Sequence, residues 1–145
     1  MNLEELQNMW SNDCQIDDNH LDRESVTTPK LHSKYLNHLI RSKLQLAKLR
    51  SDYNILRQSK FRYYRGELSR DELSGLGWEQ WQGIKPLKNE MDEFLGGDSM
   101  LNGIDIKIQY IQGMIDFLES VMGQLKSRDF QISNAVKWKM FISGA

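Results

Sequence analysis

Residues 57–66 hold the densest group of side chains in this sequence that could do chemistry. Four cations alternate with three aromatic rings along this short segment. Cations neutralise phosphates, and ring faces stack on unpaired bases at roughly 1–3 kcal/mol per base. The combination therefore predicts a site for single-stranded nucleic acid. We predict that this site consists of Arg57, Lys60, Arg62, Tyr63, Tyr64 and Arg65.

A structural interpretation of the same segment stays open. In that interpretation Phe61 and Tyr63 lie in the core, and the neighbouring cations are simply solvated. Tyr64, Arg62 and Arg65 are harder to place in a core. A protein that reads double-stranded DNA is not expected, because no helix-turn-helix or zinc-finger pattern accompanies the basic residues.

Signals for catalysis or metal binding are weak. His20, His32 and His38 have no cysteine or carboxylate at metal-ligand spacing. No glycine-rich phosphate-binding loop occurs, and the acidic clusters fall at polar ends of elements, where solvated carboxylates are usual. We expect no catalytic residue, no metal site and no cofactor. A small hydrolase with an unrecognised site is the least favoured alternative.

The predicted site must be positioned by a long helix. Thr28 is its predicted N-cap, and Pro29 its predicted first residue. Neither proline nor glycine interrupts residues 31–64, and apolar residues recur there at steps of three and four. The cations of this helix recur every seven residues, with Asp52 as its only acid. So many uncompensated positive charges favour a polyanionic partner.

The remaining elements are shorter or less regular. Asn2 and Glu5 form a capping-box pattern at the start of a helix that should end near residue 12. Residues 13–28 indicate a surface linker, and residues 67–98 an irregular connector with one modest helix. Another helix follows, and residues 130–141 indicate a final short one.

A seam of apolar residues runs along the helix that follows the connector. Its steps alternate between four and three over three heptads, which is typical of helix association. The flanking apolar surface exceeds what one partner within the chain would need, so we predict that the seam mediates oligomerisation. Its members are Ile104, Ile108, Ile111, Ile115, Leu118, Met122 and Leu125.

Composition agrees with an all-α fold. The 145 residues have a net charge of −1, are 39% hydrophobic and include only two prolines. The charge is segregated: residues 30–70 carry +9, between two acidic blocks. We expect one helical domain over residues 1–145, with an N-terminal part to residue 66, the connector 67–98 and an oligomerisation part from residue 99. The acidic N-terminus, a lone Cys14 and the lack of a long apolar run favour a reducing interior and no membrane association.

Several short segments, in order along the chain, carry a family resemblance. The chain resembles the UvsY recombination mediators of T4-like bacteriophages over nearly its full length. The matching segments are Leu3-Glu-Glu-Leu6-Gln7, Ile16-Asp17, Ser33-Lys34-Tyr35-Leu36-Asn37, Tyr63-Tyr64-x-Gly66 and Lys126-Ser127-Arg128-x-Phe130-x-Ile132.

The resemblance implies a small non-enzymatic protein that binds single-stranded DNA. It further implies a ring-like homo-oligomer of six or seven subunits, associated through its C-terminal helices. Such a protein loads a RecA-like phage recombinase onto DNA coated with the phage single-strand-binding protein, in the cytoplasm of the infected bacterial host.

In that family a Lys-x-Arg pair precedes Tyr-Tyr and contributes to DNA binding. Here Gln58 stands at the Lys position and Lys60 at the Arg position. The alternative is a structural helical oligomer, such as a phage assembly component, without DNA binding.

Overall fold

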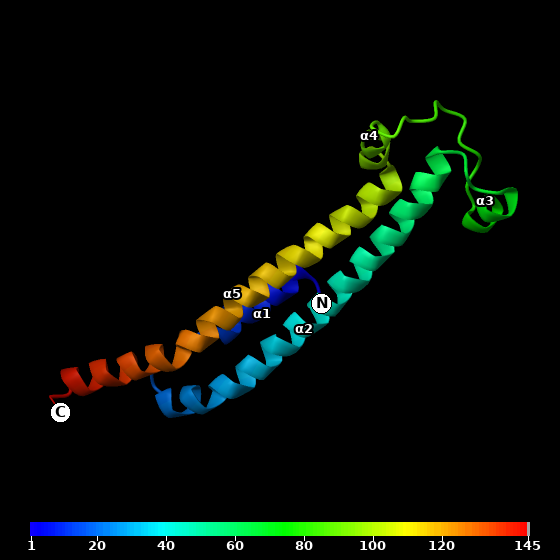
Figure 1. Ribbon diagram of the computed structural model, residues 1–145. Helices are drawn as coiled ribbons and strands as arrows, with labels where there is room; N and C mark the ends of the chain where they lie inside the picture. The colour runs from blue at the N-terminus through cyan, green and yellow to red at the C-terminus, as the bar shows by residue number, and fades with distance from the viewer. Residues whose placement is uncertain (145) are drawn as a thin grey trace. The chain divides into compact units, whose positions relative to one another are not determined.

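The computed structural model describes residues 1–144 and is all-α, as predicted (Figure 1). No strand occurs among the described residues. Among the same residues, no helix combines the length and the apolarity that crossing a membrane requires. The helices are α1 (Leu3–Asp13), α2 (Leu21–Tyr64), α3 (Arg70–Leu76), α4 (Met91–Gly96) and α5 (Ser99–Ile142).

The start of α1 confirms the predicted capping box. The side chain of Asn2 accepts a hydrogen bond from the backbone N–H of Glu5 at 2.8 Å, and the Glu5 carboxylate accepts one from the backbone N–H of Asn2 at 3.2 Å. Two of the N–H groups that a helix start leaves without partners are thereby satisfied.

The start of α2 differs from the prediction. The helix begins at Leu21, so Thr28 is not its N-cap and Pro29 lies inside it. The Thr28 hydroxyl instead donates to the Glu24 carbonyl at 3.3 Å. Proline inside a helix costs about 3 kcal/mol, and long-range contacts stabilise the turns that precede Pro29. Arg128, only 3% exposed, donates to Glu24 at 2.5 Å and to Thr28 at 3.3 Å.

Helix α5 is continuous for 44 residues, so the separate short helix predicted at residues 130–141 is wrong. The Arg128-Asp129 pair contains neither proline nor glycine and leaves the backbone hydrogen bonds intact. Gly103, Gly113 and Gly123 lie within this helix, and a Cβ added at any of them meets no neighbouring atom within 4 Å. Packing within the described chain therefore does not require glycine at these positions.

Two compact units divide the described chain, and their boundaries fall inside α2 and α5. The first unit contains Met1–Leu44 and Gln112–Ala145. Leu6, Tyr35 and Leu118 are at most 1% exposed in its core. The Tyr35 ring meets Trp10 of α1 edge to face at 5.2 Å between centroids, and its hydroxyl donates to Asp13 at 2.8 Å. Aromatic and polar contacts thus fix α1 against α2.

The second unit, Gln45–Ile111, contains the end of α2, the connector and the start of α5. Its core consists of Tyr64, Met91, Leu95 and Leu101. Half-buried aromatic residues surround these four. The connector therefore folds back on the last turns of α2, whereas the sequence indicated only irregular structure with one modest helix.

Much of the apolar seam predicted for oligomerisation lies in the chain's own core. Ile111, Ile115, Leu118 and Leu125 are at most 5% exposed, and the other three members are half-buried. The exposed apolar residues of α5 belong to different positions, concentrated in its last turns. Among them are Phe130, Trp138, Met140, Phe141 and Ile142.

Candidate nucleic-acid interface

The predicted site lies at the C-terminal end of α2, which Gly66 closes as expected. Gly66 has φ +71°, a left-handed conformation that glycine adopts without strain. Its N–H donates to the Tyr63 carbonyl at 3.0 Å, and the Glu67 N–H donates to the Arg62 carbonyl at 3.0 Å. These bonds satisfy the last carbonyls of α2 and turn the chain into the connector.

Substituting Gly66→Ala should lower the free energy of unfolding by about 1 kcal/mol or more, because a Cβ is strained in the left-handed region. The added Cβ would also lie 3.1 Å from Cε of Lys85. Urea denaturation measures the change. The matched variant Gly103→Ala lies in open space inside α5 and should instead stabilise by up to about 1 kcal/mol. Equal effects of the two substitutions would contradict the assigned strain.

Lys60 is buried at the centre of the site, with 8% of its surface exposed. Its Nζ lies 3.2 Å from Oδ2 of Asp98, which also accepts a hydrogen bond from the Tyr64 hydroxyl at 2.6 Å. The same ammonium lies 4.3 Å from the ring centroid of Trp78 and 5.2 Å from that of Tyr63. Lys60 is thus held by one carboxylate and two ring faces.

Asp98 connects this buried group to the start of α5. Its Oδ1 accepts hydrogen bonds from the backbone N–H groups of Met100 and Leu101, both at 3.0 Å. Burial alone would raise the pKa of Asp98, but hydrogen bonds from Tyr64, Leu101 and Lys60 outweigh it and hold the pKa below its usual range. Burial and the bond to Asp98 raise the pKa of the Tyr64 hydroxyl.

Three arginines of the predicted site remain accessible and pair with connector or α4 carboxylates. Arg57 and Arg65 are exposed, and Arg62 is half-buried. The hydrogen bond between Arg62 and Glu72 lowers the pKa of the Glu72 carboxyl and raises that of Arg62. The pairs are Arg57 with Asp92 at 3.4 Å, Arg62 with Glu72 at 2.7 Å and Arg65 with Glu67 at 2.9 Å.

The aromatic residues of the segment face the core rather than solvent. Tyr64 is 8% exposed, so the expectation that it is hard to place in a core is wrong. Tyr63 is half-buried, and its hydroxyl donates to the Glu79 carbonyl at 2.6 Å. Its ring packs edge to face on Trp78 at 5.3 Å between centroids. The rings therefore hold the connector against α2.

The structure thus divides the six predicted residues into two groups. Arg57, Arg62 and Arg65 present charge at the surface, whereas Lys60 and Tyr64 lie inside with Asp98 and the half-buried Tyr63 packs beside them. Other cations of α2 add to this charge. Arg41, Lys48 and Arg50 are exposed, and within residues 1–144 their side chains make no hydrogen bond or ion pair.

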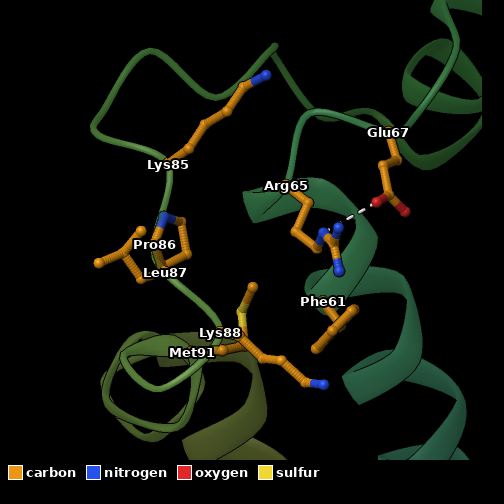
Figure 2. A pocket seen from close by; sticks show the side chains of 8 residues that line it. All are labelled: Phe61, Arg65, Glu67, Lys85, Pro86, Leu87, Lys88 and Met91. Atoms are coloured by element: carbon orange, nitrogen blue, oxygen red, sulfur yellow. Dashed lines mark ion pairs between the residues drawn. The ribbon is translucent and has the colours of Figure 1, made fainter.

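Two further candidate residues, which the sequence did not indicate, come from the connector. Lys85 and Lys88 lie beside the end of α2 and line a cleft there (Figure 2). Their signal in the sequence is a basic pair around Pro86, inside a block of residues that is otherwise acidic. Within residues 1–144, no group of His, Cys, Asp or Glu has the geometry to hold a metal ion.

Together these features define an all-helical protein whose long basic helix ends in cations suited to a polyanion. The chain belongs to the UvsY family, because the sequence model of that family, described as recombination, repair and ssDNA binding protein UvsY, matches residues 9–145. The resemblance inferred from the sequence is therefore confirmed.

Individual relatives agree with this assignment. The recombination protein uvsY of Enterobacteria phage T4 is 28% identical over 144 residues, which cover 99% of both chains. Crystal structures of the bacteriophage T4 recombination mediator protein UvsY are 26% identical and superpose with a TM-score of 0.84. The match to the lattice type II structure covers 99% of this chain and 98% of the T4 chain. The match to the lattice type IV structure covers 97% of this chain and 99% of the T4 chain.

Proposed function

We propose that this protein is a recombination mediator that binds single-stranded DNA through the end of α2. It loads a RecA-like recombinase onto DNA coated with the phage single-strand-binding protein, in the cytoplasm of the infected host. The observation that carries the proposal is the group of accessible cations at this helix end, Arg57, Arg62 and Arg65, in a chain of this family. The chain itself needs no cofactor for this role.

The buried residues of the site act by positioning in this proposal. Lys60 and Tyr64 bind Asp98, which accepts hydrogen bonds from the first turn of α5. The network thereby fixes the end of α2 relative to the start of α5. This network has little contact with solvent, and it positions the arginines that bind DNA.

The DNA contacts should be electrostatic and therefore sensitive to salt. Substituting Arg57→Gln together with Arg65→Gln should weaken binding of a fluorescent oligo-dT and flatten the slope of log affinity against log salt by about 1.4, or about 0.7 per phosphate contact. Fluorescence anisotropy at several salt concentrations measures both quantities.

The matched control is Lys30→Gln with Lys126→Gln, which removes two exposed charges that lie in the first unit. This pair should leave the slope nearly unchanged. A larger loss in the control than in the arginine variant would move the DNA surface to Lys126 and its neighbours. Wild-type protein that binds no oligo-dT would favour the alternative, a structural helical oligomer without DNA binding.

We also propose that the mediator is a ring-like homo-oligomer of six or seven subunits. Exposed apolar residues in the last turns of α5, including Trp138 and Phe141, supply surface for association. One basic helix end per subunit would give a flexible strand several weak sites at once, and linked weak sites bind far more tightly than single ones. Hydrolysis of ATP belongs to the recombinase partner in this mechanism.

A further inference from the structure

The second unit contains a cleft of about 420 Å³ between the end of α2 and residues 85–91. Figure 2 shows Phe61 and Arg65 on the α2 side, with Lys85, Pro86 and Leu87 following one another along the opposite side. A volume of this size is typical of pockets that hold a small organic group. The cleft combines positive charge with apolar surface.

The positive charge comes mainly from the connector. Arg65 and Glu67 form a half-exposed ion pair at 2.9 Å, so a phosphate that binds Arg65 competes with this carboxylate. Lys85 and Lys88 are exposed, and within residues 1–144 neither side chain makes a hydrogen bond or an ion pair. The lining therefore keeps two uncompensated ammonium groups, which suit a phosphate.

The apolar surface lies between these charges. Phe61 and Pro86 are half-buried, and Met91, at 3% exposed, belongs to the core of the unit. The guanidinium of Arg65 lies 5.6 Å from the Phe61 ring centroid. An aromatic base that enters the cleft would therefore meet a ring, a proline and a guanidinium plane, all of which favour stacking.

Lys85 packs against Gly66, the residue that ends α2. A Cβ at residue 66 would lie 3.1 Å from Cε and 3.4 Å from Nζ of Lys85. The lysine stem therefore rests against the backbone of the glycine that ends α2. Lys85 therefore lies at the end of α2 with its side chain exposed.

We infer that this cleft binds one nucleotide of a single DNA strand. Lys85 and Lys88 contact the phosphates on its two sides, and the unpaired base lies against Phe61 and Pro86. The inference rests on the proposed function and deepens it, because it gives a physical basis for preferring single strands. A base inside a duplex is stacked on both faces and cannot enter a cleft of this kind.

Two labelled oligonucleotides of equal length test the inference: oligo-dT, and an abasic strand that has phosphates without bases. The variant Lys85→Gln with Lys88→Gln keeps the side-chain stems and removes both charges. It should bind both probes roughly 10-fold or more weakly at 0.1 M salt, with a slope flattened by about 1.4. The control pair, Lys30→Gln with Lys126→Gln, should lose much less affinity for both probes.

The variant Phe61→Leu tests the base contact separately. It should bind oligo-dT roughly 5-fold more weakly and the abasic strand as well as wild type does. Thermal unfolding of each variant, followed by circular dichroism, establishes that the helices remain intact. A parallel loss on both probes would mean that Phe61 only supports the fold, and would overturn the base contact.

The outcomes separate this inference from the proposed function. If wild type binds oligo-dT and the double lysine variant binds it equally well, the cleft inference is wrong while the proposed function stands. If wild type binds no oligo-dT, the proposed function itself fails. If the lysine variant loses binding of a fluorescent acidic peptide and keeps oligo-dT binding, the cleft takes a peptide and the nucleotide inference is overturned.

Discussion

Substituting Lys60→Met should lower the free energy of unfolding by about 3 kcal/mol, because removal of one partner of a buried ion pair leaves the other charge uncompensated. The partner, Asp98, keeps only 4% of its side chain exposed. Urea denaturation at neutral pH measures the loss. The control is Arg62→Met, which lies in α2 like Lys60 and breaks the half-exposed pair with Glu72 of α3, and it should cost far less.

The pH dependence of stability tests the same network. The pKa of Asp98 is lower in the folded chain than its ordinary value of 3.8. An acid with a lowered folded pKa contributes stability that is fully present above its unfolded pKa and is lost as the pH falls through the folded pKa. Wild type should therefore lose stability more steeply than the Lys60→Met variant as the pH drops below about 4. If plots of the free energy of unfolding against pH run parallel for the two proteins, Lys60 is not coupled to Asp98.

A double substitution distinguishes positioning by Lys60 from direct contact with DNA. Lys60→Met with Asp98→Asn removes both charges, while the asparagine oxygen can still accept from the N–H groups of Met100 and Leu101 and its NH2 group can donate to the Tyr64 hydroxyl oxygen. Replacing a buried pair by uncharged groups is often close to neutral for stability. If DNA affinity returns with stability in this double variant, Lys60 acts by positioning. If the variant is stable and still fails to bind, Lys60 contacts DNA itself.

Local signals in the sequence were sufficient to predict the ends of several helices. The capping box at Asn2 and Glu5 and the left-handed Gly66 depend on neighbouring residues only, so the sequence shows them directly. The helix start predicted at Thr28-Pro29 was wrong, because a contact from Arg128, a hundred residues away, supports a helix that begins earlier. No local pattern reports such a partner.

The candidate site shows the same difference between local and long-range information. The sequence identified the run of cations and rings, but it could not indicate that Asp98, beyond the connector, would bury Lys60. Likewise, the heptad pattern identified an apolar stripe on α5 without indicating which helix covers it. Leu118, a member of that stripe, is fully buried within the chain's own first unit.

Substituting Trp138→Glu together with Phe141→Glu should convert the proposed oligomer into smaller species. These rings are 61% and 74% exposed and stack at 5.7 Å between centroids near the end of α5. Large exposed rings of this kind favour burial in an interface, and a carboxylate in their place cannot be buried there without a partner. Light scattering and sedimentation velocity measure the change in size.

The choice of these residues follows from burial. Glutamate at Ile111 or Leu118, in the predicted seam, would place a charge in the core of the chain and unfold it rather than separate subunits. The matched control is Ser133→Glu with Asn134→Glu, which adds the same charge at exposed positions of the same helix. This control should keep the wild-type size. Wild type that sediments as a monomer at micromolar concentration would contradict self-association.

The same variant tests whether avidity underlies mediation. Separated subunits should retain weak binding of oligo-dT, since each keeps its own helix end, and should lose the roughly 10²- to 10⁴-fold gain that linked sites provide. They should also fail to shorten the lag in ATP hydrolysis by the cognate recombinase on DNA coated with single-strand-binding protein. A dissociated variant that shortens this lag as well as wild type does would show that one helix end is enough. Loading would then depend on contacts of a single subunit with the recombinase, even though the strand is bound through the same cations.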